Sequence, residues 1–344
     1  MPRDLDIPDL ASPRLTPADL VPLIRARGEQ AEALRDRADH LRRRTVGDSI
    51  HLRGIIEFSS YCRCNCEYCG LRADNPSAVR YRLTPDEVLE ACEVVSSFGF
   101  GTVVLQSGED PWWTAERLAE VIVRIKKDTG LAITLSVGER DEEDYRTWRE
   151  AGADRYLLRH ETADPELYAR LHPGASFEAR VQCMHVLRGL GYQVGAGSIV
   201  GLPGQTWEAL GLDLLFMRDM QFHMGSVGPL VPHPGTPLRD EPVGDTQTVL
   251  NMMALLRLMI PDIMLPSTTS LETALEGGRL WGLRCGANVI MPNLTPRSVA
   301  AKYEIYPGKK APWITLEDEV GRAMALIRKA GRVAGTGPGH SPRA

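Results

Sequence analysis

Eight short apolar runs, each followed by a longer amphipathic stretch, occupy the chain between residues 54 and 292. Strands that alternate with helices are joined by right-handed crossovers and build a parallel sheet. Eight such units favour a closed (βα)8 barrel of the TIM type. An open doubly wound sheet is the alternative, because periodicity alone does not separate the two folds. The eight runs are residues 54–59, 102–106, 132–136, 155–159, 194–201, 225–230, 263–268 and 287–292.

The sequence outside these repeats predicts shorter flanking segments. Residues 1–48 read as a helical extension, since Thr16 can cap a helix and Pro17 fits its first turn. Residues 49–308 form the predicted barrel, and residues 309–332 a C-terminal helical segment. Residues 333–344 are rich in Gly and Pro, and we expect a disordered tail there.

The overall composition limits the kinds of partner. A formal charge of -5, with 43% hydrophobic and 25% charged residues, is ordinary for a globular protein and gives no reason to expect nucleic acid or a membrane as a partner. The N-terminus has no apolar run of signal-peptide length, and the most apolar later stretch is broken by Arg257, Pro261 and Asp262. We therefore expect a cytoplasmic protein.

Four of the seven cysteines lie in "YCRCNCEYCG", residues 61–70, directly after the first predicted strand. Loops that follow the strands carry the chemistry of parallel barrels. Cys62, Cys66 and Cys69 have the spacing C-x3-C-x2-C, which lets one loop direct three thiolates at one inorganic cluster. Soft thiolates select iron-sulfur clusters, zinc or copper(I).

A structural zinc site is the alternative and would need Cys64 as its fourth ligand. Alternate residues of one loop do not readily converge, so we expect Cys64 to point away. Three ligands leave one iron of a 4Fe-4S cluster open to a chelating small molecule, for which S-adenosylmethionine is the candidate. The spacing, with the aromatic Tyr68 just before Cys69, resembles the signature of the radical S-adenosylmethionine superfamily.

That resemblance directs attention to polar residues at other strand ends. "LQSGEDP" places Ser107, Gly108 and Glu109 after the second run and resembles the superfamily's motif for the methionine amino group. "RYLLRHETAD" places Arg155 and Arg159 on one side of the fourth run, where we expect them to point together and recognise carboxylates. The glycines of residues 191–204 suit backbone contact with adenine.

Longer stretches resemble the HydE family of FeFe-hydrogenase maturases from about residue 50 to 308, among them "EFSSYCRCNCEYCGLRADN", "VLQSGEDPWW" and "GAGSIVGLPGQT". This resemblance implies a small organometallic substrate, a cysteine-bound iron carbonyl cyanide precursor of the diiron subcluster. It implies an electron donor such as flavodoxin or ferredoxin, and other hydrogenase maturases as partners. Matching positions imply S-adenosylmethionine contacts at Tyr68, Ser107, Glu161, Arg180 and Tyr303, and substrate contacts at Thr134, Ser136, Arg159, Thr268 and Thr269.

Several members of that family bind an accessory cluster through cysteines after the "YPGK" segment. This chain has none there, so we expect one cluster. Two other readings stay open. The same barrel serves amino-acid mutases and synthases, such as 3-methylornithine synthase and biotin synthase, and a non-catalytic iron-sulfur carrier would also keep the three thiols. Hydroxyls such as Thr268 and Thr269 are as often helix caps as substrate ligands.

Overall fold

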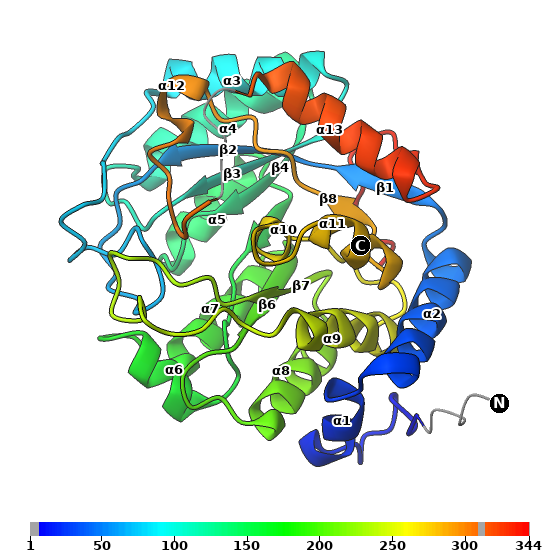
Figure 1. Cartoon of the computed structure of the whole chain (residues 1–344). Helices are drawn as coiled ribbons and strands as arrows, with labels where there is room; N and C mark the ends of the chain where they lie inside the picture. The colour runs from blue at the N-terminus through cyan, green and yellow to red at the C-terminus, as the bar shows by residue number, and fades with distance from the viewer. Residues whose placement is uncertain (1–6, 309–313, 344) are drawn as a thin grey trace.

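A parallel sheet of six strands forms most of the molecule's centre in the computed structural model, which describes residues 7–308 and 314–343 (Figure 1). The strands lie in chain order, and each pairs in parallel with the next. They are β2 (Gly54–Ser59), β3 (Thr102–Ser107), β4 (Ala132–Ser136), β5 (Arg155–Leu157), β6 (Gln193–Val200) and β7 (Met224–Pro229).

The sheet closes into a barrel through shorter pairings. Beyond β7, Met224 bridges to Met264 and Pro266 bridges to Val289 in β8 (Val289–Ile290), while Ile55 of β2 bridges to Asn293. The ring is therefore complete, and the predicted barrel is confirmed over the open sheet. The predicted seventh strand makes only single bridges, because Pro266 has no amide hydrogen and Thr268 already caps a helix.

Helices cover the outside of the ring (Figure 1). Many begin at a Ser or Thr that accepts a hydrogen bond from an amide of the first turn, as Thr84, Thr114 and Ser176 do. None of the described helices is long and apolar enough to cross a bilayer. The helices after β2 are α3 (Pro85–Ser97), α4 (Ala115–Thr129), α5 (Glu142–Glu150), α6 (Pro165–Leu171), α7 (Phe177–Gly189), α8 (Trp207–Asp219), α9 (Thr246–Met259), α10 (Thr269–Ala274), α11 (Gly278–Arg284), α12 (Arg297–Ala300) and α13 (Leu316–Lys329).

Two helices precede the barrel, where the sequence predicted a helical extension: α1 (Pro17–Ile24) and α2 (Gly28–Thr45). Thr16 and Asp19 form a capping box at the start of α1. The two helices pack against α8 and α9 respectively (Figure 1).

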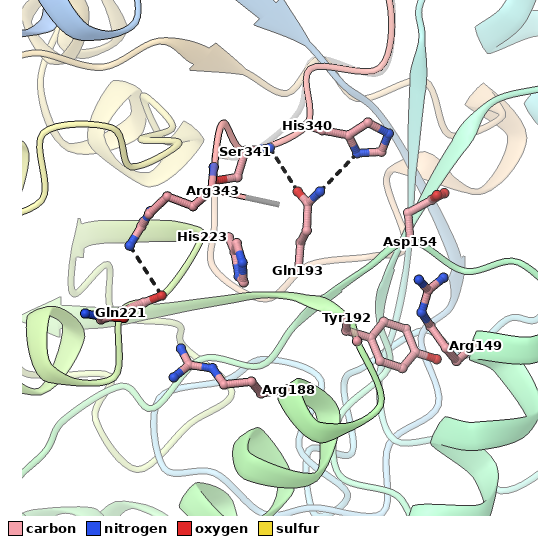
Figure 2. A pocket seen from close by; sticks show the side chains of 11 residues that line it. Arg149, Asp154, Arg188, Tyr192, Gln193, Gln221, His223, His340, Ser341 and Arg343 are labelled. Atoms are coloured by element: carbon pink, nitrogen blue, oxygen red, sulfur yellow. Dashed lines mark hydrogen bonds between the residues drawn. The ribbon is translucent and has the colours of Figure 1, made fainter.

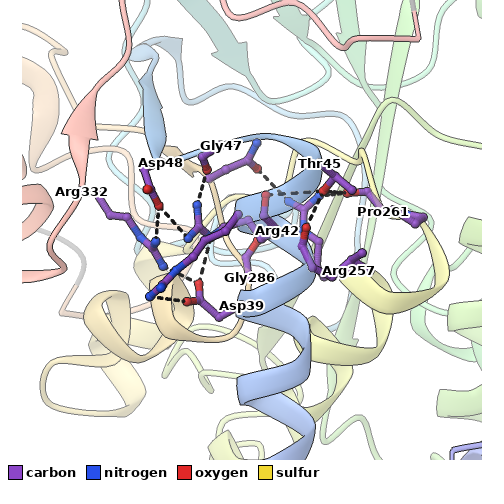
Figure 3. A network of polar contacts seen from close by, with 12 residues as sticks. Asp39, Arg42, Thr45, Gly47, Asp48, Arg257, Pro261, Gly286 and Arg332 are labelled. Carbon is purple, nitrogen blue, oxygen red and sulfur yellow. Dashed lines mark hydrogen bonds and ion pairs between the residues drawn. The ribbon is translucent and has the colours of Figure 1, made fainter.

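A buried network of charges attaches α2 to the barrel (Figure 3). Arg42 has no exposed surface, and its guanidinium contacts Asp39 at 2.9 Å and Asp48 at 3.0 Å. Arg332, from the far end of the chain, pairs with the same two carboxylates. The buried guanidinium groups of Arg42 and Arg332 are tolerated because they are paired, so this network connects α2, the residue before β1 (Ser49–Leu52) and the C-terminal segment.

The expectation of a disordered tail is wrong for residues 333–343. Val333–Ala334 forms β9, which pairs in parallel with β1. The carbonyl of Pro338 then accepts hydrogen bonds from Thr102 Oγ1 and from Arg155 Nη2, both at 2.7 Å. The Gly- and Pro-rich composition gave the wrong expectation, because this segment is held by its backbone. Its carbonyls accept hydrogen bonds from buried donors, and such bonds do not require apolar side chains.

Candidate active site at the cysteine loop

The cysteine loop leaves the carboxyl end of β2 and returns to α3, the position that catalytic loops occupy in this fold. Arg80 holds the two ends of the cysteine loop together. Its guanidinium donates to the carbonyls of Ser60 (2.5 Å) before the cysteines and of Leu71 (2.8 Å) and Arg72 (2.6 Å) after them. The amide of Ala73 also donates to the carbonyl of Cys64 at 2.8 Å. The loop is therefore shaped by backbone contacts, independently of its sulfur atoms.

Cys62, Cys66 and Cys69 lie close enough to influence one another electrostatically. Burial raises the pKa of the Cys66 thiol to about 12, and negative charge on Cys62 acts in the same direction. Burial likewise raises the pKa of Cys69, with further contributions from Cys66 and Cys62. Thiols that disfavour ionisation next to one another suit a cationic centre that compensates for their charges.

The residues of the loop fit the predicted iron-sulfur cluster through their chemistry, because Cys62, Cys66 and Cys69 are neighbouring thiols and soft thiolates are the ligands of such clusters. Among the described residues, no three His, Cys, Asp or Glu side chains converge closely enough to hold one metal ion. A cubane is larger than an ion, so its cysteine ligands stand further apart.

Cys64 turns toward Cys62 and Glu109. Its amide lies 3.4 Å from Cys62 Sγ, and the hydrogen bond between the two side chains raises the pKa of Cys64 and lowers that of Cys62 to about 7. The expectation that Cys64 points away from the other thiols is thus wrong with respect to Cys62.

The motif after β3 packs directly on this loop. A Cβ at Gly108 would lie 2.3 Å from the Tyr61 carbonyl oxygen and 2.7 Å from Cys62 Cβ, so only glycine fits there. Glu109 accepts a hydrogen bond from Arg63 Nε at 3.1 Å, which joins the motif to the cysteine loop. Ser107 donates from Oγ to the carbonyl of Gly108 at 2.7 Å.

Glu161 lies just beyond β5 in an unusual backbone conformation. Its φ of 63° is in the left-handed region, which only Gln221 shares among the described non-glycine residues. Both carboxylate oxygens accept from Arg159 Nε at 2.9 Å. Arg159 also donates to Ser226 Oγ (2.6 Å) and the Ser198 carbonyl (2.9 Å). Strained conformations persist where surrounding contacts determine them, and they cluster at functional sites.

Arg180 connects the strand ends around Cys66. It forms an ion pair with Glu139 at 2.6 Å, and it donates to Tyr168 Oη and to the Arg159 carbonyl, both at 3.1 Å. Burial would lower the pKa of Arg180, but the neighbouring Tyr168 and Glu139 raise it, so the side chain stays cationic.

Arg180, Glu161 and Tyr68 all act on the pKa of Cys66, which places these three predicted residues around one thiol. The Tyr68 hydroxyl is 2.8 Å from His172 Nε2.

The inside of the barrel carries polar side chains. Thr134 is fully buried in β4, and its hydroxyl has no hydrogen-bond partner among the described residues. Because strand residues alternate, Thr134 and Ser136 face the interior while Ile133 and Leu135 pack in the outer core. Gln106 Nε2 donates to Tyr303 Oη at 3.3 Å. Barrel interiors are ordinarily filled with branched apolar residues, so this lining is suited to a polar ligand.

Some predicted residues lie elsewhere or serve other contacts. Thr268 is the N-cap of α10, and Thr269 Oγ1 accepts from Arg279 at 2.7 Å. Arg155 does not point together with Arg159: it lies at the opposite end of β5, where its guanidinium contacts Pro338 and His340. The alternation of residues in a strand predicts whether a side chain points into or out of the barrel. It does not predict how far along the barrel axis that side chain lies, and Arg155 and Arg159 differ in this respect.

Two residues of the site were missed. Glu139 pairs with Arg180 and donates its amide to Glu109 Oε1 at 2.8 Å, and it directly follows Gly138, a turn signal after the third run. A Cβ at Gly138 would lie 2.1 Å from Glu109 Cγ, which explains that glycine. His172, the partner of Tyr68, lies at the end of α6 and had no motif to mark it.

Known proteins resemble this chain over most of its length. Residues 56–216 match the Radical SAM superfamily, and residues 226–331 match the Biotin and Thiamin Synthesis associated domain. The FeFe hydrogenase maturase subunit HydE of Thermotoga maritima is 53% identical over 278 residues, which are 81% of this chain and 80% of that protein. The 3-methylornithine synthase of Methanosarcina barkeri is 33% identical over 288 residues, 83% and 81% of the two chains. The crystal structure of methylornithine synthase (PylB) superimposes with a TM-score of 0.83 at 29% identity over 95% of this chain and 96% of that one.

Proposed function

Because the chain belongs to the HydE family of the radical S-adenosylmethionine superfamily, we propose that it acts on a cysteine-bound iron carbonyl cyanide precursor of the FeFe-hydrogenase diiron subcluster. It is a radical S-adenosylmethionine enzyme that uses a 4Fe-4S cluster and S-adenosylmethionine. The observation that carries the proposal is the 53% identity across four fifths of both chains, compared with 33% for the amino-acid synthase. When bound at Cys62, Cys66 and Cys69, the cluster would supply the electron for reductive cleavage of the sulfonium.

The chain's own residues bind and orient the reactants. Cys62, Cys66 and Cys69 would hold the cluster at the end of β2. Arg180 is the candidate ligand for the methionine carboxylate, since its Nη2 makes no hydrogen bond to a described residue. Glu161 is fixed by Arg159, so it can accept hydrogen bonds from the ribose or the amino group without rearranging.

The substrate would lie deeper in the barrel. The unpartnered Thr134 hydroxyl is the strongest support for a polar ligand there. Ser136 lies on the same face of β4, and we assign it the same role. Arg159 is already bonded to Glu161 and Ser226, so its contribution to substrate binding is positional. An electron donor such as flavodoxin or ferredoxin and the other hydrogenase maturases complete the proposed set of partners.

Two measurements test this function. Protein reconstituted without oxygen and reduced with dithionite should form 5'-deoxyadenosine from S-adenosylmethionine, and the cysteine-iron carbonyl cyanide complex should be consumed. No 5'-deoxyadenosine, with or without that complex, would favour the non-catalytic carrier. Turnover of lysine in place of the iron complex would instead place the chain with the 3-methylornithine synthases.

A further inference from the structure

A pocket of about 740 Å³ opens at the end of the barrel opposite the cysteine loop (Figure 2). Its walls come from residues at or directly before the start of three strands, Asp154, Gln193 and His223, and from the ends of α5 and α7. The C-terminal tail closes one side with residues 340–343. This pocket takes no part in the proposed reaction.

One turn holds two guanidinium groups at this pocket. Arg188 donates to the carbonyl of Met220, and Arg343 donates to those of Gln221 (3.5 Å) and Phe222 (2.6 Å). Gln221 has a φ of 48°, in the left-handed region that non-glycine residues rarely adopt. Three successive carbonyls therefore anchor two cations from distant parts of the chain, and Figure 2 shows both at the pocket wall.

The charges of the pocket do not balance. Arg343 pairs with Asp262 at 3.0 Å, and Asp154 pairs with Lys126 at 3.1 Å. Arg149 and Arg188 have no carboxylate within 4.0 Å anywhere in residues 7–308 and 314–343. Among the described residues, two cations thus face the pocket without a carboxylate paired to them, since the one carboxylate of the wall, Asp154, pairs with Lys126.

The positive charges around the pocket lower the pKa values of the groups beside them. Burial lowers the pKa of His223, and the charges on Arg343 and Arg188 lower it further. Burial and the charge on Arg343 also lower the pKa of Arg188. Groups that repel one another in the same cleft would be relieved by a bound anion.

Helix capping alone does not account for this arrangement. Arg149 and Arg188 lie in the last turns of α5 and α7, where a cation complements the helix dipole. Arg343 belongs to neither helix, and it reaches the pocket from the tail. Capping also requires no cavity between the guanidinium groups.

We propose that this pocket binds a multivalent oxyanion, a small molecule with two or more carboxylate or phosphate groups. Arg188 and Arg343 bind one anionic group, and Arg149 binds another across the pocket. Guanidinium groups suit this role because their planar donors match carboxylate and phosphate oxygens. The bound anion also stabilises the position of the tail, because the backbone amide of Ser341 donates to Gln193 Oε1 at 3.0 Å on the same wall of the pocket.

Titration calorimetry on the full chain tests the proposal with sodium pyrophosphate and trisodium citrate, against sodium chloride at equal ionic strength. At least one of the two should bind, and the preferred one identifies the anionic group as phosphate or carboxylate. Arg188→Gln should weaken binding about tenfold, which is the loss of one charge-assisted hydrogen bond. Arg124→Gln, which removes an exposed arginine paired with Asp86 on the outer surface, should bind as the wild type does.

Hydrogen exchange provides a second, local readout. The preferred anion should slow amide exchange in residues 338–343, and it should not do so in Arg188→Gln. If Arg188→Gln does not fold, Arg149→Gln carries the same test. Absence of binding by both anions, or equal affinity in the wild type and a folded pocket variant, would overturn the proposal.

Discussion

Replacing Glu161 by alanine and by glycine separates the backbone strain at this residue from the chemistry of its carboxylate. Both variants lose the two hydrogen bonds from Arg159, so that loss cancels when the variants are compared. Alanine keeps the left-handed conformation at a φ of 63°, which costs about 1–2 kcal/mol for a residue with a Cβ. Glycine avoids this cost but gives up about 0.5–1 kcal/mol of chain entropy on folding. Glu161→Gly should therefore be more stable than Glu161→Ala by about 1 kcal/mol.

Urea denaturation of the apo variants without oxygen measures this difference from the two midpoints and a shared slope. Glu166 provides a matched control, because it is an exposed acidic residue in the first turn of α6. There the order should reverse, with glycine less stable than alanine by up to about 1 kcal/mol. If Glu161→Ala equals or exceeds Glu161→Gly in stability, the inference of strain is refuted. Both Glu161 variants should lose S-adenosylmethionine cleavage.

Three further predictions concern the site and its supports. Cys66→Ala should abolish cluster binding while Cys64→Ala keeps iron content near that of the wild type; equal iron loss in both would overturn the ligand assignment. Gly197→Ala would place a Cβ 2.1 Å from the Ser226 hydroxyl, so it should cost about 1–3 kcal/mol in denaturant unfolding, and an unchanged midpoint would contradict the packing. Burial alone would raise the pKa of Asp110, but hydrogen bonds from Arg82 and Ser59 outweigh burial, so the pKa of Asp110 in the folded protein lies below its usual value. Its contribution to stability is therefore complete above the unfolded pKa of 3.8 and is lost as pH falls below it; an acid-unfolding curve unchanged in Asp110→Asn would disprove this.

The sequence was most informative where a pattern repeats. Strand and helix periodicities recur through the chain, so the barrel followed from them, and the cysteine spacing located the cluster loop. Residues 263–268 show the limit of that reasoning, because an apolar run that contains Pro266 cannot form a continuous ladder. The tail shows another limit, since hydrogen bonds to Pro338 from buried donors leave no trace in composition.

The contacts within the site could be predicted less well from the sequence than the fold. Glu161 was found by its place after a strand, yet its left-handed backbone depends on contacts with the neighbouring Arg159 and with Ser198, which lies on the next strand, β6. Glu139 was missed because it acts through Arg180, which is 41 positions away in the sequence. Pairings of this kind arise only when distant strand ends come together.

We propose that three cysteines hold the cluster and leave one iron for S-adenosylmethionine. Electron paramagnetic resonance on the reconstituted, dithionite-reduced protein tests it most directly. We expect the signal of a reduced 4Fe-4S cluster whose g values change when S-adenosylmethionine is added. A signal that stays the same at saturating S-adenosylmethionine, or a protein that holds zinc in place of iron, would contradict it.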